Sequence, residues 1–357
     1  MAALEMKPTR TPNLKHPCKR TAPMKLTILL TAAITICAHA APLKVYVLAG
    51  QSNMQGHASI TTFDYLAKDP KTAPLLAEMR GKDGKPTVCE RVWASYLSDD
   101  RAGNPTIKEG NLTVGFAARE DTIGPEFTFG ITLQKLSKEP ILIIKTAWGG
   151  KNLHTDFRPP SSSGEGAGIY YKKMVDHVKK VLADPSKVVP SYNAKDGYEI
   201  AGFLWLQGWN DLVDQSHYPK RGQPGGYDSY TQDMANFIRD VRKDFNAPKM
   251  PFCIGVLGVN GPTETFDGPR YKSIYQTFRD AQAAPADMPE FKGNVIAIRT
   301  EVFWDSALAK ASDKKDRTPE EMEIAKGASN KGFHYYGAAK FFAPAGKAFA
   351  EALHNVK

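Results

Sequence analysis

The sequence has few cysteines and no apolar run long enough to cross a membrane. Four of the 357 residues are cysteine, too few for a disulfide framework in a chain of this length. Cys18 and Cys37 lie in the first forty residues, and for Cys89 and Cys253 the sequence allows either a disulfide or buried free thiols. There is no H-E-x-x-H motif, close Cys/His cluster or EF-hand spacing, so we expect no metal ion and no cofactor.

Positive charge is concentrated near the N-terminus. The formal net charge is +9 at pH 7. The first forty residues hold six of the basic residues and one acidic residue, which leaves 41 basic and 37 acidic residues in the remainder. That remainder has no lysine and arginine stripe and no basic patch with interleaved aromatics, so nucleic acid is not an expected partner.

Residues 1–40 have the pattern of an export signal. Lys25 precedes an apolar run at residues 26–37, which is too short to span a bilayer. Ala38-His39-Ala40 then forms a small-x-small cleavage site. We therefore expect a secreted or periplasmic protein.

The limits of the mature chain follow from the same pattern. Cleavage after residue 40 makes Ala41 the expected first residue of a mature chain that covers residues 41–357. Met24 is a more typical start than Met1. Residues 1–23 are therefore interpreted as an over-extended gene start or as a long basic leader.

Strand and helix patterns alternate along the mature chain. Continuous apolar runs, typical of buried parallel strands, lie at residues 45–49, 141–147, 200–207, 251–257 and 294–300. Weaker strand patterns lie at residues 87–97 and 112–116. Helical spacing is found near residues 125–136, 170–182, 227–245, 271–281 and 335–353, and the charged residues 306–331 are interpreted as a solvated excursion. The alternation predicts a single α/β domain, a three-layer α/β/α sandwich with a doubly wound, mainly parallel sheet of about five strands.

Ser52 is the candidate nucleophile. The first predicted strand ends in Gly50, and Ser52 follows one residue later. Ligands of open α/β sheets bind outside the carboxyl ends of the strands, so this serine lies where chemistry is expected. The alternative interpretation is that Ser52 caps the next helix.

Other polar turns follow other predicted strands. Gly149-Gly150 comes after residues 141–147, residues 207–211 end the next strand, and His334 lies beyond the last strand. In a doubly wound sheet these turns share one rim with Ser52. Ester hydrolysis by a serine needs a base and hydrogen-bond donors for the oxyanion, and this rim offers both.

Four short motifs resemble those of the SGNH hydrolases, specifically the sialate O-acetylesterase-like branch that includes acetylxylan esterases. They are Gly50-Gln51-Ser52-Asn53-Met54, Gly124-Pro125-Glu126, Lys145 to Gly150, and Trp205-Leu206-Gln207-Gly208. Met54 stands where the G-x-S-x-G elbow of α/β-hydrolases has its second glycine. The resemblance implies an SGNH fold and a serine esterase without a cofactor.

The resemblance also implies roles for individual residues. Ser52 becomes the nucleophile, and its own N–H and that of Gly150 become oxyanion donors. The side-chain amide of Gln207 is implied as a third donor. Gly208-x-Asn210-Asp211 looks like the G-x-N-D block of other SGNH hydrolases, so Asn210 competes with Gln207 for this role.

His334 is the expected general base, because the family places a histidine just before its last helix. Three other histidines are alternatives. His57 is too close to Ser52 in sequence to reach back to it easily, whereas His154 and His217 fall in loops that could equally contact substrate.

The acid that orients the base is the largest departure from the family. Relatives carry an aspartate three residues before the histidine, and this sequence has Lys331 there. Asp305, at the end of the last predicted strand, is the expected replacement. The alternative is that Asp305 caps residues 306–331 and that a backbone carbonyl orients His334.

Three tryptophans follow strand ends. Trp148, Trp209 and Trp304 are candidates to stack on sugar rings, with core packing as the alternative.

The predicted function is a secreted carbohydrate O-acetylesterase, a carboxylic ester hydrolase that forms an acyl-enzyme. The alternative functions are a glycan-binding protein on the same scaffold with weak or lost catalysis, and a lipase-like GDSL enzyme. For the acetylated glycan the sequence leaves xylan, sialic acid, pectin and a marine polysaccharide as alternatives.

Overall fold

The computed structural model describes residues 8–9, 12, 41–164 and 166–356. The expected leader, apart from three of its residues, therefore lies outside the described part of the chain, and so do Cys18 and Cys37. The described residues from 41 onward form one compact unit. Within the described residues no helix is long and apolar enough to cross a bilayer.

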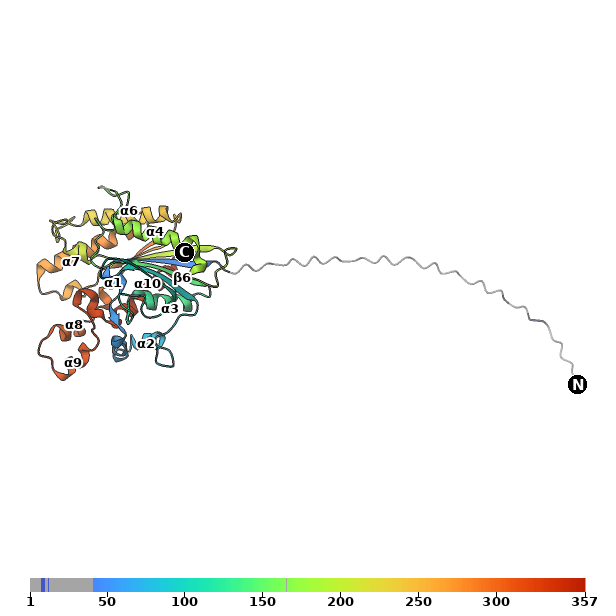
Figure 1. Ribbon diagram of the computed structural model, residues 1–357, viewed down its shortest axis with the longest axis horizontal. Coiled ribbons are helices and arrows are strands. Elements are labelled where there is room, and N and C mark those ends of the chain that lie inside the picture. The colour runs from blue at the N-terminus through green and yellow to red at the C-terminus, as the bar shows by residue number, and fades with distance from the viewer. Residues whose placement is uncertain (1–7, 10–11, 13–40, 165, 357) are drawn as a thin grey trace. The chain divides into compact units, whose positions relative to one another are not determined.

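A seven-stranded sheet forms the centre of this unit (Figure 1). The strand order is β4-β3-β6-β1-β7-β8-β9, and all neighbouring strands are parallel except β3 and β4. The strands are β1 (Leu43–Gly50), β3 (Val92–Asp99), β4 (Pro105–Asn111), β6 (Ile141–Ala147), β7 (Tyr198–Leu206), β8 (Phe252–Val256) and β9 (Val295–Arg299). The predicted α/β class is confirmed, and the sheet has seven strands where about five were expected.

β1 occupies the point at which the strand order reverses. It pairs with β6 on one side and with β7 on the other. Every residue of β6 is buried, as the continuous apolar run at residues 141–147 predicts for a strand covered on both faces. Ligands of doubly wound sheets bind outside the strand ends at such a reversal. The turns after these three strands are therefore the expected site.

Helices cover both faces of the sheet. Figure 1 shows α4 and α6 on one side of the sheet and α3 on the other. Pro125 begins α3, where its fixed φ suits the first helical position. The helices are α1 (Ser52–Gln55), α2 (Ala73–Met79), α3 (Pro125–Leu136), α4 (Ile169–Ala183), α5 (Trp209–Val213), α6 (Asp228–Asp244), α7 (Pro269–Ala283), α8 (Ser306–Asp313), α9 (Pro319–Ala325) and α10 (Ala339–Asn355).

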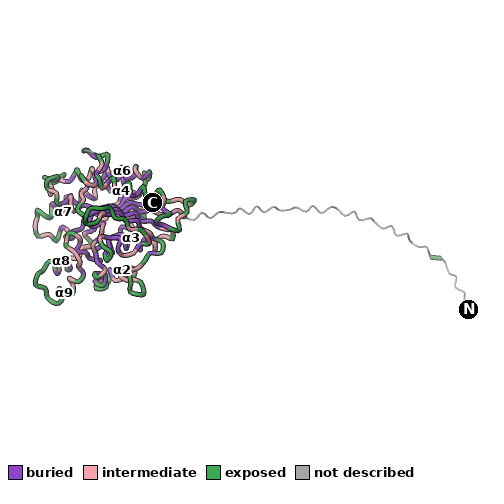
Figure 2. The backbone as a smooth tube through the Cα atoms, viewed as in Figure 1, coloured by how far each residue is buried: buried purple, intermediate pink, exposed green. Residues whose placement is uncertain are grey.

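Short elements connect these helices and strands. A separate two-stranded antiparallel sheet pairs β2 (Ala58–Ser59) with β5 (Thr122–Ile123). The 3₁₀ helices are η1 (Ile60–Lys68), η2 (Pro185–Lys187), η3 (Thr263–Thr265), η4 (Ala284–Asp287), η5 (Thr300–Phe303) and η6 (Gly332–Gly337). Buried residues concentrate along the central sheet (Figure 2). Cys89 and Cys253 are both buried and free, so they do not form a disulfide.

Several predicted boundaries are wrong. Residues 112–116 are not a strand, and β3 pairs instead with β4, an exposed edge strand without an apolar signal. Residues 306–331 include two helices, α8 and α9, and a capping box at Thr318 begins the second. α10 begins at Ala339 rather than near residue 335, because Tyr335 and Tyr336 have φ values of 51° and 58°, outside the helical region.

Candidate active site

The turn after β1 places Ser52 at the edge of the sheet. A side chain at Gly50 would lie 2.1 Å from the carbonyl oxygen of Leu206, so only glycine allows β1 and β7 to approach this closely. Ser52 then begins α1, and the residue is 8% exposed. The N-cap of α1 is Gln51, and no side chain caps the helix. The interpretation of Ser52 as a helix cap is therefore wrong.

The turn after β6 lies beside this serine. A Cβ atom at Gly149 would be 3.9 Å from the Cβ atom of Ser52. Gly150 is exposed and has a φ of 72°, a left-handed conformation that favours glycine. The N–H of Ser52, at the start of α1, has no acceptor within its helix. The backbone N–H groups of Ser52 and Gly150 thus lie in the two neighbouring turns that follow β1 and β6.

A pocket of about 370 Å³ lies at the turns that follow β1 and β6. Four of the residues expected to act in catalysis line it: Ser52, Gly150, Asn210 and His334. The remaining lining residues are Gln55, His57, Gly149, Trp209 and Phe333. The tertiary structure therefore brings together groups from the ends of β1, β6 and β7 and from η6.

Asn330 holds the ring of His334. Its Oδ1 accepts a hydrogen bond from the backbone N–H of Lys331 at 2.8 Å, which identifies this atom as the amide oxygen. The same oxygen lies 3.1 Å from Nδ1 of His334, so Nδ1 carries the proton. Nε2 of His334 is then left unprotonated. Burial lowers the pKa of His334 to about 4, so the ring is neutral at neutral pH.

Asp305 does not contact His334, contrary to our expectation. Its Oδ1 accepts from the N–H of Leu308 at 2.9 Å, which caps α8. Its Oδ2 lies 2.8 Å from Nζ of Lys340 and accepts from the hydroxyl of Tyr65 at 3.3 Å. Both carboxylate oxygens are thus occupied away from the pocket. The alternative interpretation is correct in that Asp305 caps α8, but the partner of Nδ1 is the Asn330 side chain and not a backbone carbonyl.

His57 lies in the pocket, contrary to the expectation that it is too close to Ser52 in sequence to reach back to it. Its ring stacks on that of His334, with centroids 4.0 Å apart and planes 6° from parallel. α1 is only one turn long, which is why a residue so near Ser52 in sequence can return to the same pocket. Burial, and secondarily the neighbouring His334, lower the pKa of His57 to about 3. The stacked pair is therefore neutral above mildly acidic pH.

Asn210 faces the pocket, whereas Gln207 does not. The side-chain Nε2 of Gln207 donates to Oδ2 of Asp211 at 2.5 Å and to the carbonyl of Lys151 at 3.0 Å. The Gln207 side chain is thus buried within the protein and absent from the pocket lining, which contradicts its expected role. Oδ1 of Asn210 accepts from Nε2 of Gln51 at 3.0 Å, which leaves the Asn210 Nδ2 amide group to face the pocket.

Only one of the three candidate tryptophans lines the pocket. Trp209 does, and its ring centroid is 6.0 Å from that of Phe333. Trp148 is 2% exposed and packs against Phe157 and Tyr170, so its expected role in sugar stacking is wrong. Trp304 packs against Tyr335 and Tyr336 and is absent from the pocket lining, so it follows the core-packing alternative.

A buried ion pair contacts the C-terminal end of α1. Nζ of Lys145 lies 2.6 Å from Oε2 of Glu126, and both side chains are at most 1% exposed. The same Nζ donates to the carbonyl oxygens of Gln55 at 2.9 Å and of Phe116 at 2.7 Å. Oε1 of Glu126 accepts from the N–H of Gly124 at 2.8 Å. Two of the sequence motifs, Gly124–Glu126 and Lys145–Gly150, therefore meet in one hydrogen-bonded unit that also holds the end of α1 at Gln55.

Two of the pocket's features were missed at the level of sequence. Gln51 precedes the candidate nucleophile, and its Oε1 accepts from the N–H of Gly208 at 3.0 Å while its amide fixes Asn210. Asn53 ties α1 to the histidine segment, since its Nδ2 donates to the carbonyl of Phe333 at 3.2 Å. The position of Gln51 and Asn53 within the Gly50–Met54 motif was the sequence signal that could have identified them.

Among the described residues, no group of three His, Cys, Asp or Glu side chains forms a potential metal site.

Residues 42–300 match the family model described as carbohydrate esterase, sialic acid-specific acetylesterase. The chain belongs to this family. It is therefore a carboxylic ester hydrolase of the carbohydrate O-acetylesterase type, in agreement with the sequence motifs. No curated protein matches the sequence. The Ser52 turn, the Gly149-Gly150 turn and Asn210 all lie within the matched residues of this acetylesterase.

Three solved structures are similar to this chain at low sequence identity. A protein from Arabidopsis thaliana is 17% identical with a TM-score of 0.48, and the match covers 88% of this chain and 100% of that one. NanS is 16% identical with a TM-score of 0.45, covering 88% of this chain and 97% of NanS. A carbohydrate acetylesterase from Xanthomonas citri is 15% identical with a TM-score of 0.41, covering 71% of this chain and 49% of that one. These values are too low to transfer residue roles.

Proposed function

We propose that this acetylesterase acts through an acyl-enzyme on Ser52. The hydroxyl oxygen attacks the acetyl carbonyl, the sugar leaves as an alcohol, and water then releases acetate from the serine. The observation that carries this proposal is that Ser52, His334, Gly150 and Asn210 line one pocket. A serine, a histidine and several N–H donors are the groups that the two-step reaction requires.

His334 is the proposed proton shuttle. The bond from Nδ1–H to Asn330 leaves the lone pair of Nε2 available to take the hydroxyl proton of Ser52. The resulting imidazolium then donates that proton to the leaving sugar oxygen. A depressed pKa of about 4 keeps the base unprotonated over the neutral range. Asn330 acts as a positioning residue in place of the aspartate found in relatives.

Three donors are proposed for the oxyanion. They are the backbone N–H groups of Ser52 and Gly150 and the side-chain amide of Asn210. The bond from Gln51 holds the Asn210 amide in one orientation before substrate arrives, and preorganised donors of this kind stabilise the developing negative charge. Gln207 supports this arrangement from inside the protein through its bonds to Asp211 and Lys151.

A burst experiment tests the proposal. Mixing enzyme with excess p-nitrophenyl acetate should release about one equivalent of p-nitrophenol rapidly, followed by slower turnover. Ser52→Ala should abolish both phases, whereas the matched control Ser191→Ala, at an exposed position, should retain them. A folded wild-type protein without esterase activity would instead support the alternative of a glycan-binding protein that has lost catalysis.

We also propose that the enzyme acts outside the cytoplasm. The support is the apolar run at residues 26–37 followed by Ala38-His39-Ala40, a pattern typical of a cleaved export signal. Mass spectrometry of the protein from its native host should find a mature N-terminus near Ala41. An intact N-terminus ahead of Met24 in the cytoplasmic fraction would contradict export.

A further inference from the structure

The ring of His57 covers one face of the ring of His334. Both residues line the catalytic pocket, and their ring planes lie 6° from parallel with centroids 4.0 Å apart. The ring of Phe333 meets His334 edge-on instead, at 68° with centroids 4.5 Å apart. The acyl-enzyme reaction at Ser52 gives His57 no step of its own, so the position of this second histidine requires another explanation.

The backbone at His57 is held by bonds that do not involve its side chain. The N–H of Gly56 donates to the carbonyl oxygen of Ser52 at 3.0 Å, which ends α1 directly before His57. The N–H of Ser59 donates to the hydroxyl of Ser329, in the segment that leads to η6, at 3.0 Å. The ring of His57 is thus attached both to the helix of the nucleophile and to the segment of the base.

The bond to Asn330 does not by itself fix the plane of the His334 ring. It constrains one atom, Nδ1, whereas the ring torsion χ2 of histidine has a broad range. A charged acceptor would hold the ring more strongly than a neutral amide does. A second ring stacked on one face limits this torsion, because a tilt of either ring would bring their atoms into collision.

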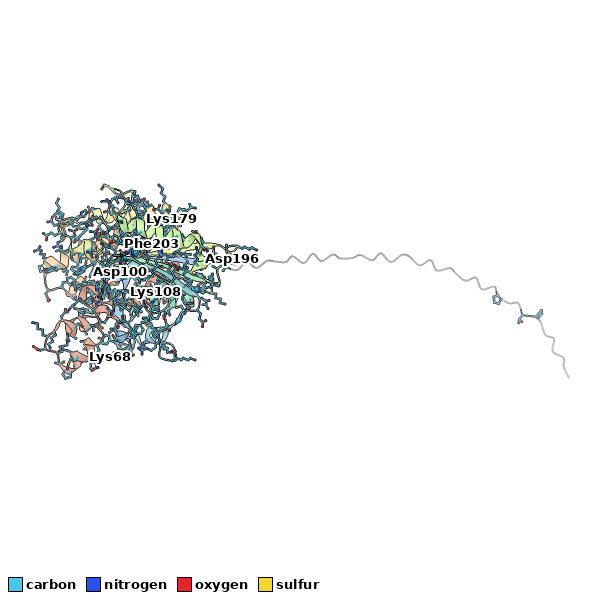
Figure 3. The ribbon with its side chains drawn as sticks, viewed as in Figure 1. Lys68, Asp100, Lys108, Lys179, Asp196 and Phe203 are labelled. Atoms are coloured by element: carbon cyan, nitrogen blue, oxygen red, sulfur yellow. The ribbon has the colours of Figure 1, made fainter. Side chains whose placement is uncertain are left out.

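The catalytic pocket has no charged side chain that could do this instead. None of the described residues that line it is Asp, Glu, Lys or Arg. Asp100 and Lys108, two of the charged side chains labelled in Figure 3, do not belong to its lining. The ring of His57 is therefore the group in the pocket lining that covers a face of the base.

The nitrogen atoms of His57 do not explain its position. Nε2 is buried and has no hydrogen-bond partner among the described residues. Burial is the main cause that lowers the pKa of His57 to about 3, followed by the charges of His334, Arg119 and Lys145. His57 therefore stays neutral wherever His334 is neutral, and its contact with the base is made through the face of the ring.

We propose that His57 is a positioning residue for His334, whose ring face sets the plane of the base and shields that face from water. Fixing the plane fixes the direction of the Nε2 lone pair, on which proton transfer from Ser52 depends. His57 thereby compensates, together with Asn330, for the aspartate found in relatives. This inference rests on the proposed function of His334 as the proton shuttle.

Three replacements separate the flat ring, the apolar cover and the nitrogens. His57→Phe keeps a flat ring without nitrogens, His57→Leu keeps cover without a flat ring, and His57→Ala removes both. Hydrolysis of p-nitrophenyl acetate is measured at pH 8, where His334 is unprotonated in each variant. Misplacement of a catalytic group costs up to about 10²-fold, so kcat should fall about ten- to hundredfold in the Leu and Ala variants. It should stay within about threefold of the wild type in His57→Phe, with KM changed by about twofold or less in all three.

The pH profile of kcat/KM is a readout that a packing role would not move. Burial lowers the pKa of His334, and His57→Ala opens the covered face to water. Its acid limb should therefore move up by about half a pH unit or more, whereas the limbs of His57→Phe and His57→Leu should stay near that of the wild type. Urea unfolding checks that each variant is folded. His354→Ala, at an exposed position on α10, is the matched control and should behave like the wild type in all assays.

The comparison of His57→Phe with His57→Leu decides the proposal even where His57→Ala does not fold. A kcat at least about threefold higher in His57→Phe than in His57→Leu supports it, and equal values or the reverse order overturn it. A wild type without a p-nitrophenol burst, or a burst that persists in Ser52→Ala, would overturn the acyl-enzyme proposal instead. A burst that is lost in Ser52→Ala, together with equal kcat in the Phe and Leu variants, would overturn the role of His57 alone.

Discussion

Replacing Asn210 and Gln207 by alanine tests the oxyanion site most directly. Asn210 faces the pocket with its Oδ1 fixed by Gln51. A single side-chain donor aimed at an oxyanion contributes about 10²–10³ in kcat, which corresponds to about 2.7–4 kcal/mol. Asn210→Ala should therefore lower kcat by about that factor and leave KM nearly unchanged, because the bond forms mainly in the transition state.

Gln207→Ala should chiefly reduce stability. The mutation removes the amide that donates to Oδ2 of Asp211 and the oxygen that accepts from the hydroxyl of Tyr230 at 3.1 Å. Each buried group left without its partner costs about 1–3 kcal/mol, so the free energy of unfolding should fall by about 2–6 kcal/mol. Burial already raises the pKa of Asp211 to about 6, and loss of the Gln207 bond should raise it further.

The two variants are compared by burst kinetics with p-nitrophenyl acetate and by urea unfolding. Gln232→Ala, an exposed amide on α6, is the matched control and should behave like the wild type in both assays. The reasoning is refuted if Gln207→Ala keeps its urea midpoint and loses 10²-fold or more in kcat while Asn210→Ala remains active. That result would return the donor role to Gln207.

Three further predictions concern the histidine pair and its neighbours. The kcat/KM of the wild type should stay level from neutral pH down to about pH 5 and fall near pH 4, where protonation of His334 removes the base. A fall in kcat/KM near pH 6.5 would contradict the conclusion that burial lowers the pKa of His334. Asn330→Ala should lower kcat about five- to tenfold through loss of one hydrogen bond. Asn330→Asp should move the acid limb of the pH profile to higher pH, because a carboxylate favours the imidazolium. Asp305→Asn should leave that limb in place. The pKa of His57 is about 3 in the folded state against 6.5 in the unfolded state, so the unfolded state binds more protons as the pH falls below 6.5. The wild type should therefore lose about 2 kcal/mol of stability through His57 between pH 7 and pH 5. His57→Gln should lack this loss when urea unfolding is measured at the two pH values.

The positions of the buried strands along the chain, and of Ser52 directly after the first of them, could be predicted from the sequence. The apolar runs at residues 45–49 and 141–147 became β1 and β6, because strands covered on both faces must be apolar throughout. β4 could not be predicted, because an exposed edge strand needs no apolar pattern. The bend at Tyr335 and Tyr336 also has no local signal, since both residues adopt left-handed φ values that the surrounding packing imposes.

The identity of the supporting residues was decided only by the tertiary structure. Gln51 and Asn210 are 159 residues apart and meet through one hydrogen bond, so no local pattern could rank Asn210 above Gln207. Asp305 follows a strand end, as an orienting acid should, yet Lys340 and the first turn of α8 bind its carboxylate. The sequence by itself determined which strand ends meet at the site, because strand direction and burial are encoded locally. Which side chain at each end faces the pocket depends on hydrogen bonds between distant segments, and these exist only in the folded chain.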